Sequence, residues 1–342
     1  MQLIIRGNTD QIKGIALILM FIHHFFTFPE WWMEGISYPK LAQLAPWVSS
    51  PLKICVGVFC FLTGYFYYYR KNKDYRYSLR KIIDLLIAYW CVYLILGSLA
   101  VVLCHYPYTG KAIILEMLAL ERPVMTFAWY VYFYVLAMLL LPVVSMLLRG
   151  EILLDLTISI LLLPNLVTIL QTVIRWRVAD LPILQDVLGS ISGWFPILLM
   201  GYITAKHRIF ERCWNITNQY LRKKWLRMCL ALILMCLAMA GRLLLPYIQL
   251  ETAVFPVRIN MDVLYSMVFV FGALTLCRGF KNRVVRILLG MIGRYSLLMW
   301  FFSCAFFNAT ALIFQPILYL PRNPILILLW GLILCLIPSI LC

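Results

Sequence analysis

The chain has 342 residues, of which 64% are hydrophobic and only 13% are charged. A soluble globular domain is nearer half apolar and a quarter charged, so this composition excludes a soluble protein and indicates a polytopic membrane protein. The formal net charge is +16, and basic loops that face the cytoplasm and anionic lipid explain it better than nucleic acid does. The expected partner is therefore the lipid bilayer, and no nucleic-acid partner is expected.

Ten apolar segments follow one another along the chain, and most are long enough to span a bilayer as a helix. They cover residues 12–28, 51–69, 83–104, 128–147, 153–174, 188–205, 226–246, 262–278, 287–314 and 324–341. Segment 287–314 is long enough to be broken into two pieces. No internal repeat or Gly/Pro-rich linker divides the chain. We therefore predict an all-α polytopic membrane protein with about ten transmembrane helices and a single domain over residues 1–342.

Basic residues concentrate in the even-numbered loops between these segments. Loops 70–81, 148–152, 206–227 and 278–286 together hold 18 Lys and Arg residues, and the odd-numbered loops with their flanks hold about half as many. The positive-inside rule then places the even-numbered loops and both termini in the cytoplasm. The predicted location is the plasma membrane, with many passes.

The first segment carries ionisable groups near both ends. Lys13 and His24 are eleven positions apart, so on one α-helix they lie about 16 Å apart along the axis and within about 20° around it. Asp10 precedes Lys13 by one turn and is close enough to pair with it, whereas His23 points about 100° away from His24. Ionisable groups inside a membrane are costly and usually functional. The alternative is that Lys13 snorkels to one interface and both histidines lie at the headgroup level of the other.

Histidine offers few candidates for proton transfer, because the chain contains only four. His24 is the best placed, since a neutral imidazole exchanges its proton near neutral pH. His105 follows the third segment at the predicted outer interface, and His207 sits in a basic loop. The signature motifs of soluble enzymes are absent. The eleven cysteines form no CxxC pair, so neither a disulfide framework nor a metal site is expected.

Polar and aromatic residues mark two further segments. Thr63 and Gly64 lie among bulky aromatics in the second segment, where a glycine either allows close helix approach or admits a substrate tail. Trp129 and Tyr130 begin the fourth segment and either join the interfacial aromatic belt or contact substrate. Each pair is a candidate part of a substrate site.

Basic side chains have two interpretations. The cytoplasmic loops either set the topology alone or also bind a phosphorylated cosubstrate through charge-assisted hydrogen bonds. Arg175 and Arg177 lie at the predicted outer end of the fifth segment. They either anchor that helix at the interface or contact an acceptor glycan or a lipid phosphate.

The first segment resembles the opening motif of the integral-membrane acyltransferase family often called acyltransferase 3. That motif reads Asp-x-x-(Arg/Lys)-Gly and continues to a histidine separated from the basic residue by ten residues, which corresponds to Asp10, Lys13, Gly14 and His24. Further similarities follow in order at residues 61–65, 80–90, 129–130, 195–210 and 289–300. The resemblance therefore covers most of the chain.

The resemblance implies a ten-span bacterial enzyme that acylates hydroxyls of extracytoplasmic sugars. The donor would be an acyl-CoA, with acetyl-CoA expected as a cosubstrate and no cofactor bound permanently. The acceptor would be a glycan or a lipid-linked sugar, and glycan-assembly proteins would be possible partners. His24 would act as general base on the acceptor hydroxyl or as a transient acyl carrier.

The resemblance also assigns roles to basic residues. Lys13, held by Asp10, would supply positive charge near the thioester or the phosphates of the donor. Arg80 and Lys81 match the basic loop that leads into the family's third helix, so they are candidate cosubstrate contacts. His23 either orients His24 or faces lipid, and the lipid-facing alternative is favoured.

The chain departs from the family pattern at two positions. Ser303 replaces a histidine that follows the tryptophan of a late helix, and Asp84 stands where a cation is common. The main alternative function is a transporter or flippase for a lipid-linked saccharide, which would show repeated halves and midspan charges. A membrane sensor or scaffold is a third class, which the absence of a soluble output domain disfavours.

Overall fold

The computed structural model describes residues 4, 6–32, 38–71, 73–177, 182–250 and 257–342, and nearly all of this is helix. Long apolar runs form helices because a helix satisfies its own backbone hydrogen bonds where no water is present. The α-helices are α1 (Arg6–Phe26), α2 (Pro39–Leu52), α3 (Ile54–Tyr68), α4 (Tyr75–Cys104), α5 (Gly110–Met117), α6 (Trp129–Leu147), α7 (Ile152–Leu156), α8 (Leu163–Arg177), α9 (Pro182–Lys206), α10 (Ile209–Tyr220), α11 (Lys224–Leu244), α12 (Asp262–Gly279), α13 (Arg283–Arg294), α14 (Ser296–Ser303), α15 (Ala311–Tyr319) and α16 (Pro324–Leu341). The remaining elements are the 3-10 turns η1 (Pro29–Trp31), η3 (Cys304–Phe306) and η4 (Asn308–Thr310), the π-helical η2 (Thr157–Leu162), and the strands β1 (Tyr247–Leu250) and β2 (Val257–Asn260).

Eight helical stretches in the described part of the chain are long and apolar enough to cross a membrane. A ninth is added if α13 and α14, which meet at a bend of 65°, form one span. The predicted break in segment 287–314 is therefore confirmed, and the all-α polytopic class is confirmed as well. The eight or nine candidate spans, counted by length and composition over the described residues, agree with a polytopic protein of about ten helices.

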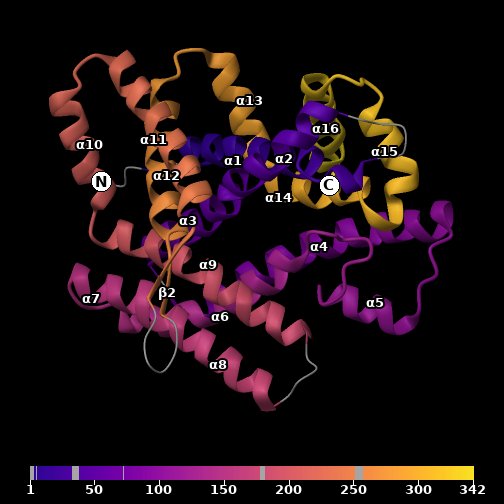
Figure 1. Cartoon of the computed structure of the whole chain (residues 1–342), viewed down its shortest axis with the longest axis horizontal. Coiled ribbons are helices and arrows are strands. Elements are labelled where there is room, and N and C mark those ends of the chain that lie inside the picture. Colours follow the sequence, from indigo (N-terminus) through magenta and orange to yellow (C-terminus); the bar gives the residue numbers. More distant parts are fainter. Residues whose placement is uncertain (1–3, 5, 33–37, 72, 178–181, 251–256) are drawn as a thin grey trace.

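Helix α1 covers the first predicted span but is not counted among these candidate spans. Asp10, Lys13, His23 and His24 lower its hydropathy, so it is not among the eight candidate spans. It lies inside the bundle instead, where it packs against α3, α12, α13 and α16 (Figure 1). None of residues 8–26 is exposed. The polar residues of α1 therefore face protein or a cavity, which is where ionisable groups are tolerated at membrane depth.

A pair of glycines allows α1 and α13 to cross closely. A Cβ atom on Gly14 would collide with the carbonyl group of Leu289, and one on Gly293 would collide with the carbonyl group of Asp10. Small residues at helix crossings let two backbones approach each other in this way. The glycine that follows Lys13 thus fixes α1 against the late helices.

Side-chain caps set the beginning of several helices. The Asp74 carboxylate accepts a hydrogen bond from the backbone N–H of Tyr77 at 3.0 Å, which starts α4. Thr109 caps α5 in the same manner, and Asn282 caps α13. Such caps satisfy backbone N–H groups that have no partner within the helix. The cap of α4 places Tyr77 and Lys81 in its first two turns.

Helices α11 and α12 are joined by a hairpin of β1 and β2, with Tyr247 opposite Asn260 in an antiparallel pair. A buried ion pair lies at the base of this hairpin. The Arg242 guanidinium donates from Nε to Oδ1 of Asp262 at 2.7 Å and from Nη2 to Oδ2 at 2.9 Å. A bidentate pair of this kind fixes orientation as well as distance, so it holds the two helix ends together.

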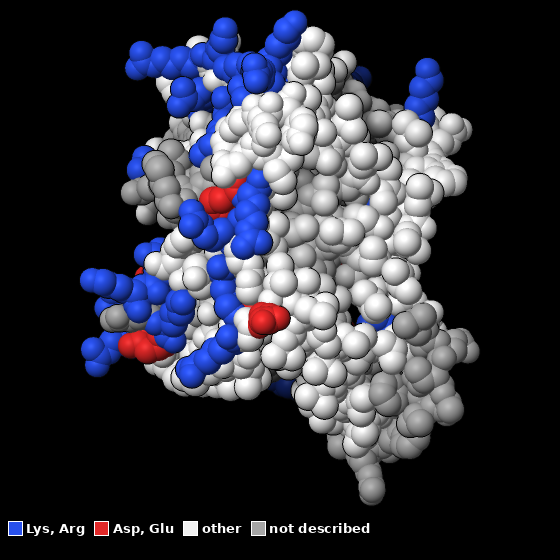
Figure 2. Space-filling view, turned by 90° about the vertical axis from the view of Figure 1, so that its left-hand side faces the viewer, with Lys and Arg blue, Asp and Glu red and all other residues white. Residues whose placement is uncertain are grey.

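One side of the molecule is strongly basic. The side where α7 and α10 lie carries many Lys and Arg residues and few Asp or Glu residues (Figures 1 and 2). This agrees with the concentration of basic residues in the even-numbered loops. The predicted cytoplasmic orientation of both termini stays a prediction.

Candidate active site

A cavity of about 850 Å³ lies between α1, α3, α4, α6, α9 and α14. This volume falls in the range of small-molecule and cofactor sites. Its polar and charged lining residues include Lys13, His23, His24, Lys53, Thr63, Arg70, Tyr77, Lys81, Asp84, Arg122, Tyr130, Gln185, Asp186, Ser190 and Ser296. Aromatic and aliphatic side chains form the rest of the wall.

The lining of this cavity carries more positive than negative charge. Lys81 pairs with Asp84 at 2.7 Å, and Arg122 pairs with Asp186 at 3.2 Å. Three further lining cations have no carboxylate within ion-pair distance in the described part of the chain, namely Lys13, Lys53 and Arg70. A cleft of one charge sign concentrates ligands of the opposite sign, so the cavity favours an anionic ligand.

Helix α1 presents Lys13 and His24 to the same cavity, as their shared helix face predicts. The expected pairing of Lys13 with Asp10 is not formed, because no ion pair or hydrogen bond joins the two side chains among the residues that the structure describes. Lys13 is therefore one of the three unpaired cations. The Asp10 carboxylate still acts on it electrostatically from beyond ion-pair distance.

The His24 ring is clamped between aromatic rings. It stacks on Phe127 with centroids 3.7 Å apart and planes 2° apart, and the edge of Phe307 lies 6.4 Å away. Its Nδ1 atom is buried and has no hydrogen-bond partner. Among the described residues no carboxylate pairs with the ring, so His24 has no partner there like the third member of a Ser-His-Asp arrangement. The aromatic contacts hold the ring plane, and the ring lines the cavity.

The favoured prediction for His23, that it faces lipid, is wrong. Its side chain is only 4% exposed and lines the cavity. The His23 Nδ1 atom lies 3.2 Å from the hydroxyl of Thr27, and the ring contacts Phe28 edge-on at 5.0 Å. The His23 ring centroid is 5.3 Å from that of His24, with no hydrogen bond between the two rings.

Glu116 of α5 braces the segment that carries Phe127. The residue is fully buried, and its Oε1 atom accepts backbone N–H groups of Val124 at 2.8 Å and Met125 at 2.7 Å. Its Oε2 atom accepts the hydroxyl of Tyr108 at 2.5 Å. Burial raises the pKa of Glu116, and these three hydrogen bonds oppose that shift. The carboxylate therefore fixes the chain two residues before the ring that stacks on His24.

The Lys13 end of the cavity is basic. Arg70 lines it and lies over the ring of Tyr77, with its guanidinium carbon 5.4 Å from the ring centroid. Lys81 also lines it and is close enough to Lys13 to act on it electrostatically. Arg80, predicted as a second cosubstrate contact, is exposed and does not line the cavity. The helical turn that points Lys81 inward points Arg80 outward.

The His24 end of the cavity mixes aromatic and polar groups. Trp129 of α6 lies 5.9 Å from Trp194 of α9, measured between ring centroids. The Arg122–Asp186 pair links the segment before α6 to α9 at this end. Lys53, at the junction of α2 and α3, lines the wall and acts electrostatically on His24. Planar rings beside amide, carboxylate and guanidinium groups suit a polyhydroxylated ligand that has one apolar face.

Thr63 and Tyr130 line the middle of the cavity. The Thr63 hydroxyl donates to the Phe59 carbonyl at 2.9 Å. The Tyr130 hydroxyl lies 4.0 Å from the Cys60 sulfur, and its ring meets Trp300 edge-on at 5.5 Å. Both residues therefore lie between the two ends, on the path that a transferred group would take.

Gly64 lies at a close helix crossing, and its contact with substrate stays a prediction. A Cβ atom on Gly64 would collide with the carbonyl group of Leu198 in α9, and one on Gly201 would collide with the carbonyl group of Phe61. The two glycines form a close crossing of α3 and α9, equivalent to the crossing of α1 and α13. Gly64 does not line the cavity.

The predicted substrate contacts of Arg175 and Arg177 cannot be assigned to a place in the site. Arg175 and Arg177 belong to the last turn of α8, and their side chains fall outside the described residues. Among the residues that are described, no group of three His, Cys, Asp or Glu side chains could hold a metal ion. Ser303, which replaces the family's late histidine, is fully buried and donates to the Trp300 carbonyl at 2.7 Å.

Comparison with protein families gives one match. A family model described as an acyltransferase domain matches residues 7–342. No curated protein and no solved structure matches the chain.

Proposed function

Because the chain belongs to the acyltransferase domain family over residues 7–342, we propose that it moves an acyl group from cytosolic acyl-CoA to a sugar hydroxyl. The chain is a multi-pass membrane acyltransferase by its family and its apolar helices. The finer proposal concerns its substrates. The donor is acetyl-CoA, and the acceptor is an extracytoplasmic or lipid-linked sugar in a bacterial plasma membrane.

One observation carries this proposal: Lys13 and His24 line the same cavity from one face of α1. Eleven residues of helix separate them by about 16 Å along the axis. Lys13 therefore suits the phosphates of the donor, and His24 suits the reacting atoms. The flexible pantetheine arm of a CoA thioester bridges the two positions, with the phosphates near Lys13, Arg70 and Lys81.

At the His24 end, the transfer needs a base. His24 takes the proton of the acceptor hydroxyl while the hydroxyl oxygen forms a bond to the thioester carbonyl carbon. The carbon–sulfur bond then breaks, and the CoA thiolate leaves and takes up a proton. In the relay version of this step, a ring nitrogen of His24 carries the acyl group first and the sugar hydroxyl receives it second. Both versions need an unprotonated ring nitrogen, and neither needs a carboxylate partner.

The residues at the His24 end of the cavity, where the acceptor would bind, support the proposal that the acceptor is a sugar. Trp129 and Trp194 offer apolar ring faces, and Gln185, Asp186 and Ser190 offer hydrogen-bonding groups along one side of α9. Sugars present an apolar face and a rim of hydroxyls, so they match such a wall. Asp84, which stands where the family has a cation, pairs with Lys81 and lowers the net charge at the donor end.

The test is transfer of radiolabelled acetyl groups by the purified protein from acetyl-CoA to a membrane glycan fraction. The parent protein should label the glycan, and His24→Ala should reduce labelling by about 10²- to 10⁴-fold, the usual contribution of a general base. His105→Asn is the matched control, because His105 is exposed with a φ of 48°, which Asn tolerates. CoA-independent movement of a lipid-linked sugar without labelling would support the transporter alternative instead. Full labelling by a folded His24→Ala protein would remove His24 from the mechanism.

A further inference from the structure

A second cavity, of about 450 Å³, lies between the end of α6, the end of α9 and the connection from α3 to α4. None of its lining residues lines the first cavity. The α7 and α10 helices follow directly after α6 and α9, so this pocket is near the basic side of the molecule (Figures 1 and 2). The proposed acyl transfer gives it no role.

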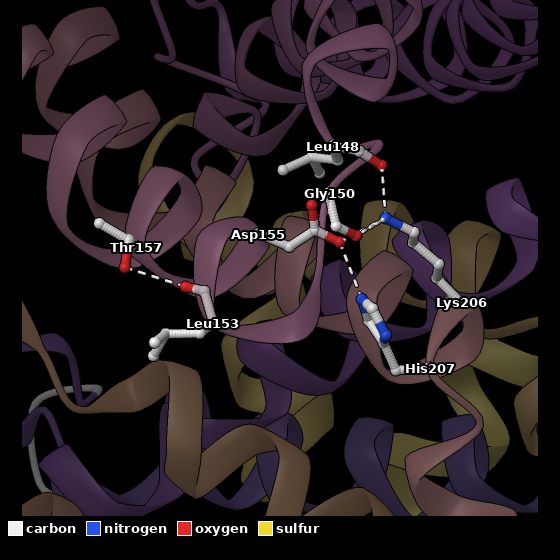
Figure 3. Close-up of polar contacts among 7 residues, drawn as sticks. All are labelled: Leu148, Gly150, Leu153, Asp155, Thr157, Lys206 and His207. Atoms are coloured by element: carbon white, nitrogen blue, oxygen red, sulfur yellow. Dashed lines mark hydrogen bonds and ion pairs between the residues drawn. The ribbon is translucent and has the colours of Figure 1, made fainter.

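Lys206 forms a fixed part of the pocket wall. Its ammonium group donates to the carbonyl oxygens of Leu148 at 2.8 Å and Gly150 at 2.9 Å, and to Oδ2 of Asp155 at 2.5 Å (Figure 3). His207 Nε2 lies 2.8 Å from the same carboxylate oxygen. The last residue of α9 is thereby tied to the carbonyl groups that follow α6. The pocket is preformed because its two walls are joined at this point.

Two other cations on the wall have no such partners. Lys73 lies over the ring of Tyr68, with its Nζ atom 4.4 Å from the centroid, and 5.4 Å from that of Tyr202. Neither Lys73 nor Arg149 pairs with a carboxylate in the part of the chain that the structure describes. Burial lowers the pKa of Lys73, so a bound anion would offset part of the cost of burying its charge. The aromatic rings keep the Lys73 side chain in place at the wall.

The chemistry of this lining selects the ligand. Lys73, Arg149 and Lys206 line the pocket and no acidic residue does. The one carboxylate behind it, Asp155, is 0% exposed and is used by Lys206 and His207. The ends of α6 and α9 also lie where candidate membrane spans end, which is the level of lipid headgroups. Basic pockets at this level suit anionic headgroups.

We propose that this second cavity binds a phosphate group, carried by an anionic lipid headgroup or by a soluble phosphate compound. The exposed side chain of Met146 on the pocket edge, with 58% exposure, gives an acyl chain an apolar surface beside the phosphate. The inference goes beyond the proposed acyl transfer and does not depend on it.

The test is native mass spectrometry of the purified full chain with phosphatidylglycerol and, separately, with phosphatidylcholine. The parent protein should retain phosphatidylglycerol in preference to phosphatidylcholine. The double variant Lys73→Gln/Arg149→Gln should weaken that binding by about 25-fold, because each cation near anionic lipid contributes about fivefold. Lys73→Arg/Arg149→Lys keeps both charges and should keep the binding. A thermal midpoint without ligand checks that each variant is folded.

A charge-matched control separates the pocket from the basic surface. Lys71→Gln/Arg76→Gln removes two exposed cations of the same region that do not line the pocket, and it should leave the binding nearly unchanged. Added inorganic phosphate distinguishes the two sources. If it displaces phosphatidylglycerol from the parent protein, the ligand is a soluble phosphate compound, and if it does not, the ligand is the lipid. Equal binding by the pocket variant and the control variant would overturn the proposal.

Discussion

Lys13 in α1 and Lys206 in α9 are both lysines set among packed helices, but their surroundings differ. Lys206 donates to two carbonyl oxygens and to a buried carboxylate. Lys13 has no such partner among the described residues and faces a cavity of about 850 Å³. A buried charge is costly unless it is paired or binds a ligand. The comparison indicates that the Lys206 cluster holds the structure together, whereas our proposal assigns Lys13 and His24 to the binding and reaction of substrates.

The largest expected effect on stability comes from breaking the satisfied cluster. Asp155→Ala leaves the Lys206 ammonium without its carboxylate, so the free energy of unfolding should fall by about 3 to 5 kcal/mol, as for other buried pairs that lose one member. Thermal unfolding in detergent measures this loss. Asp84→Ala removes an acid whose side chain is 55% exposed, and it serves as the control with a small effect. A midpoint for Asp155→Ala equal to that of Asp84→Ala would contradict the structural role.

The next effect tests the brace behind His24. Glu116→Gln replaces one acceptor oxygen by an NH₂ group, so it cannot accept from both the Tyr108 hydroxyl and the backbone N–H groups of Val124 and Met125. We expect kcat to fall about tenfold, equivalent to about 1.4 kcal/mol and within the cost of one unsatisfied buried group. The KM for acetyl-CoA should not change, because the donor end is untouched.

A control variant and a comparison of kcat with KM show whether the effect of Glu116→Gln depends on the position of Glu116. Glu121→Gln, at an exposed acid five residues further along the chain, should keep the parent kcat. Glu116 acts through Phe127 and contacts no reactant. A change in the KM for acetyl-CoA alone, with kcat preserved, would show that Glu116 does not hold the His24 end.

The smallest expected effect on stability comes from breaking the exposed Lys81–Asp84 ion pair at the Lys13 end of the cavity. Lys81→Gln breaks an ion pair whose side chains are 37% and 55% exposed, so its effect on the free energy of unfolding should stay below about 1 kcal/mol. Its effect on the KM for acetyl-CoA should exceed its effect on stability, since Lys81 also lines the cavity. Steady-state kinetics at two ionic strengths measures the contribution, which salt should reduce.

The periodicity of the sequence predicted the helices and their faces well, but it did not predict which polar side chains become partners. The apolar runs predicted the helices, and the eleven-residue spacing predicted that Lys13 and His24 face the same way. Spacing could not show that α1 is enclosed by α3, α12, α13 and α16, because that depends on packing between distant segments. For the same reason the sequence favoured a lipid-facing His23, although the structure turns it inward.

The sequence did not predict the hydrogen-bond partners of the buried acids Glu116 and Asp155. Glu116 belongs to a short semi-apolar piece, and its acceptor role appears only once the chain folds back so that residues 124 and 125 reach it. Asp155 meets Lys206 across 51 positions. A lone acid inside an apolar stretch is nonetheless a usable signal, because it must find partners or be neutralised. The position of Gly64 in the sequence fitted helix packing and substrate contact equally. In the structure Gly64 packs closely against α9.

The central claim is that Lys13 holds the donor and His24 serves the chemistry within one cavity. Measuring acetyl-CoA binding and acetyl transfer side by side for Lys13→Gln and His24→Ala tests it most directly. Lys13→Gln should weaken binding by about tenfold, near the value of one hydrogen bond to a charged group. His24→Ala should bind acetyl-CoA as the parent protein does and lose transfer. The reverse pattern, with binding lost in His24→Ala and retained in Lys13→Gln, would contradict the account.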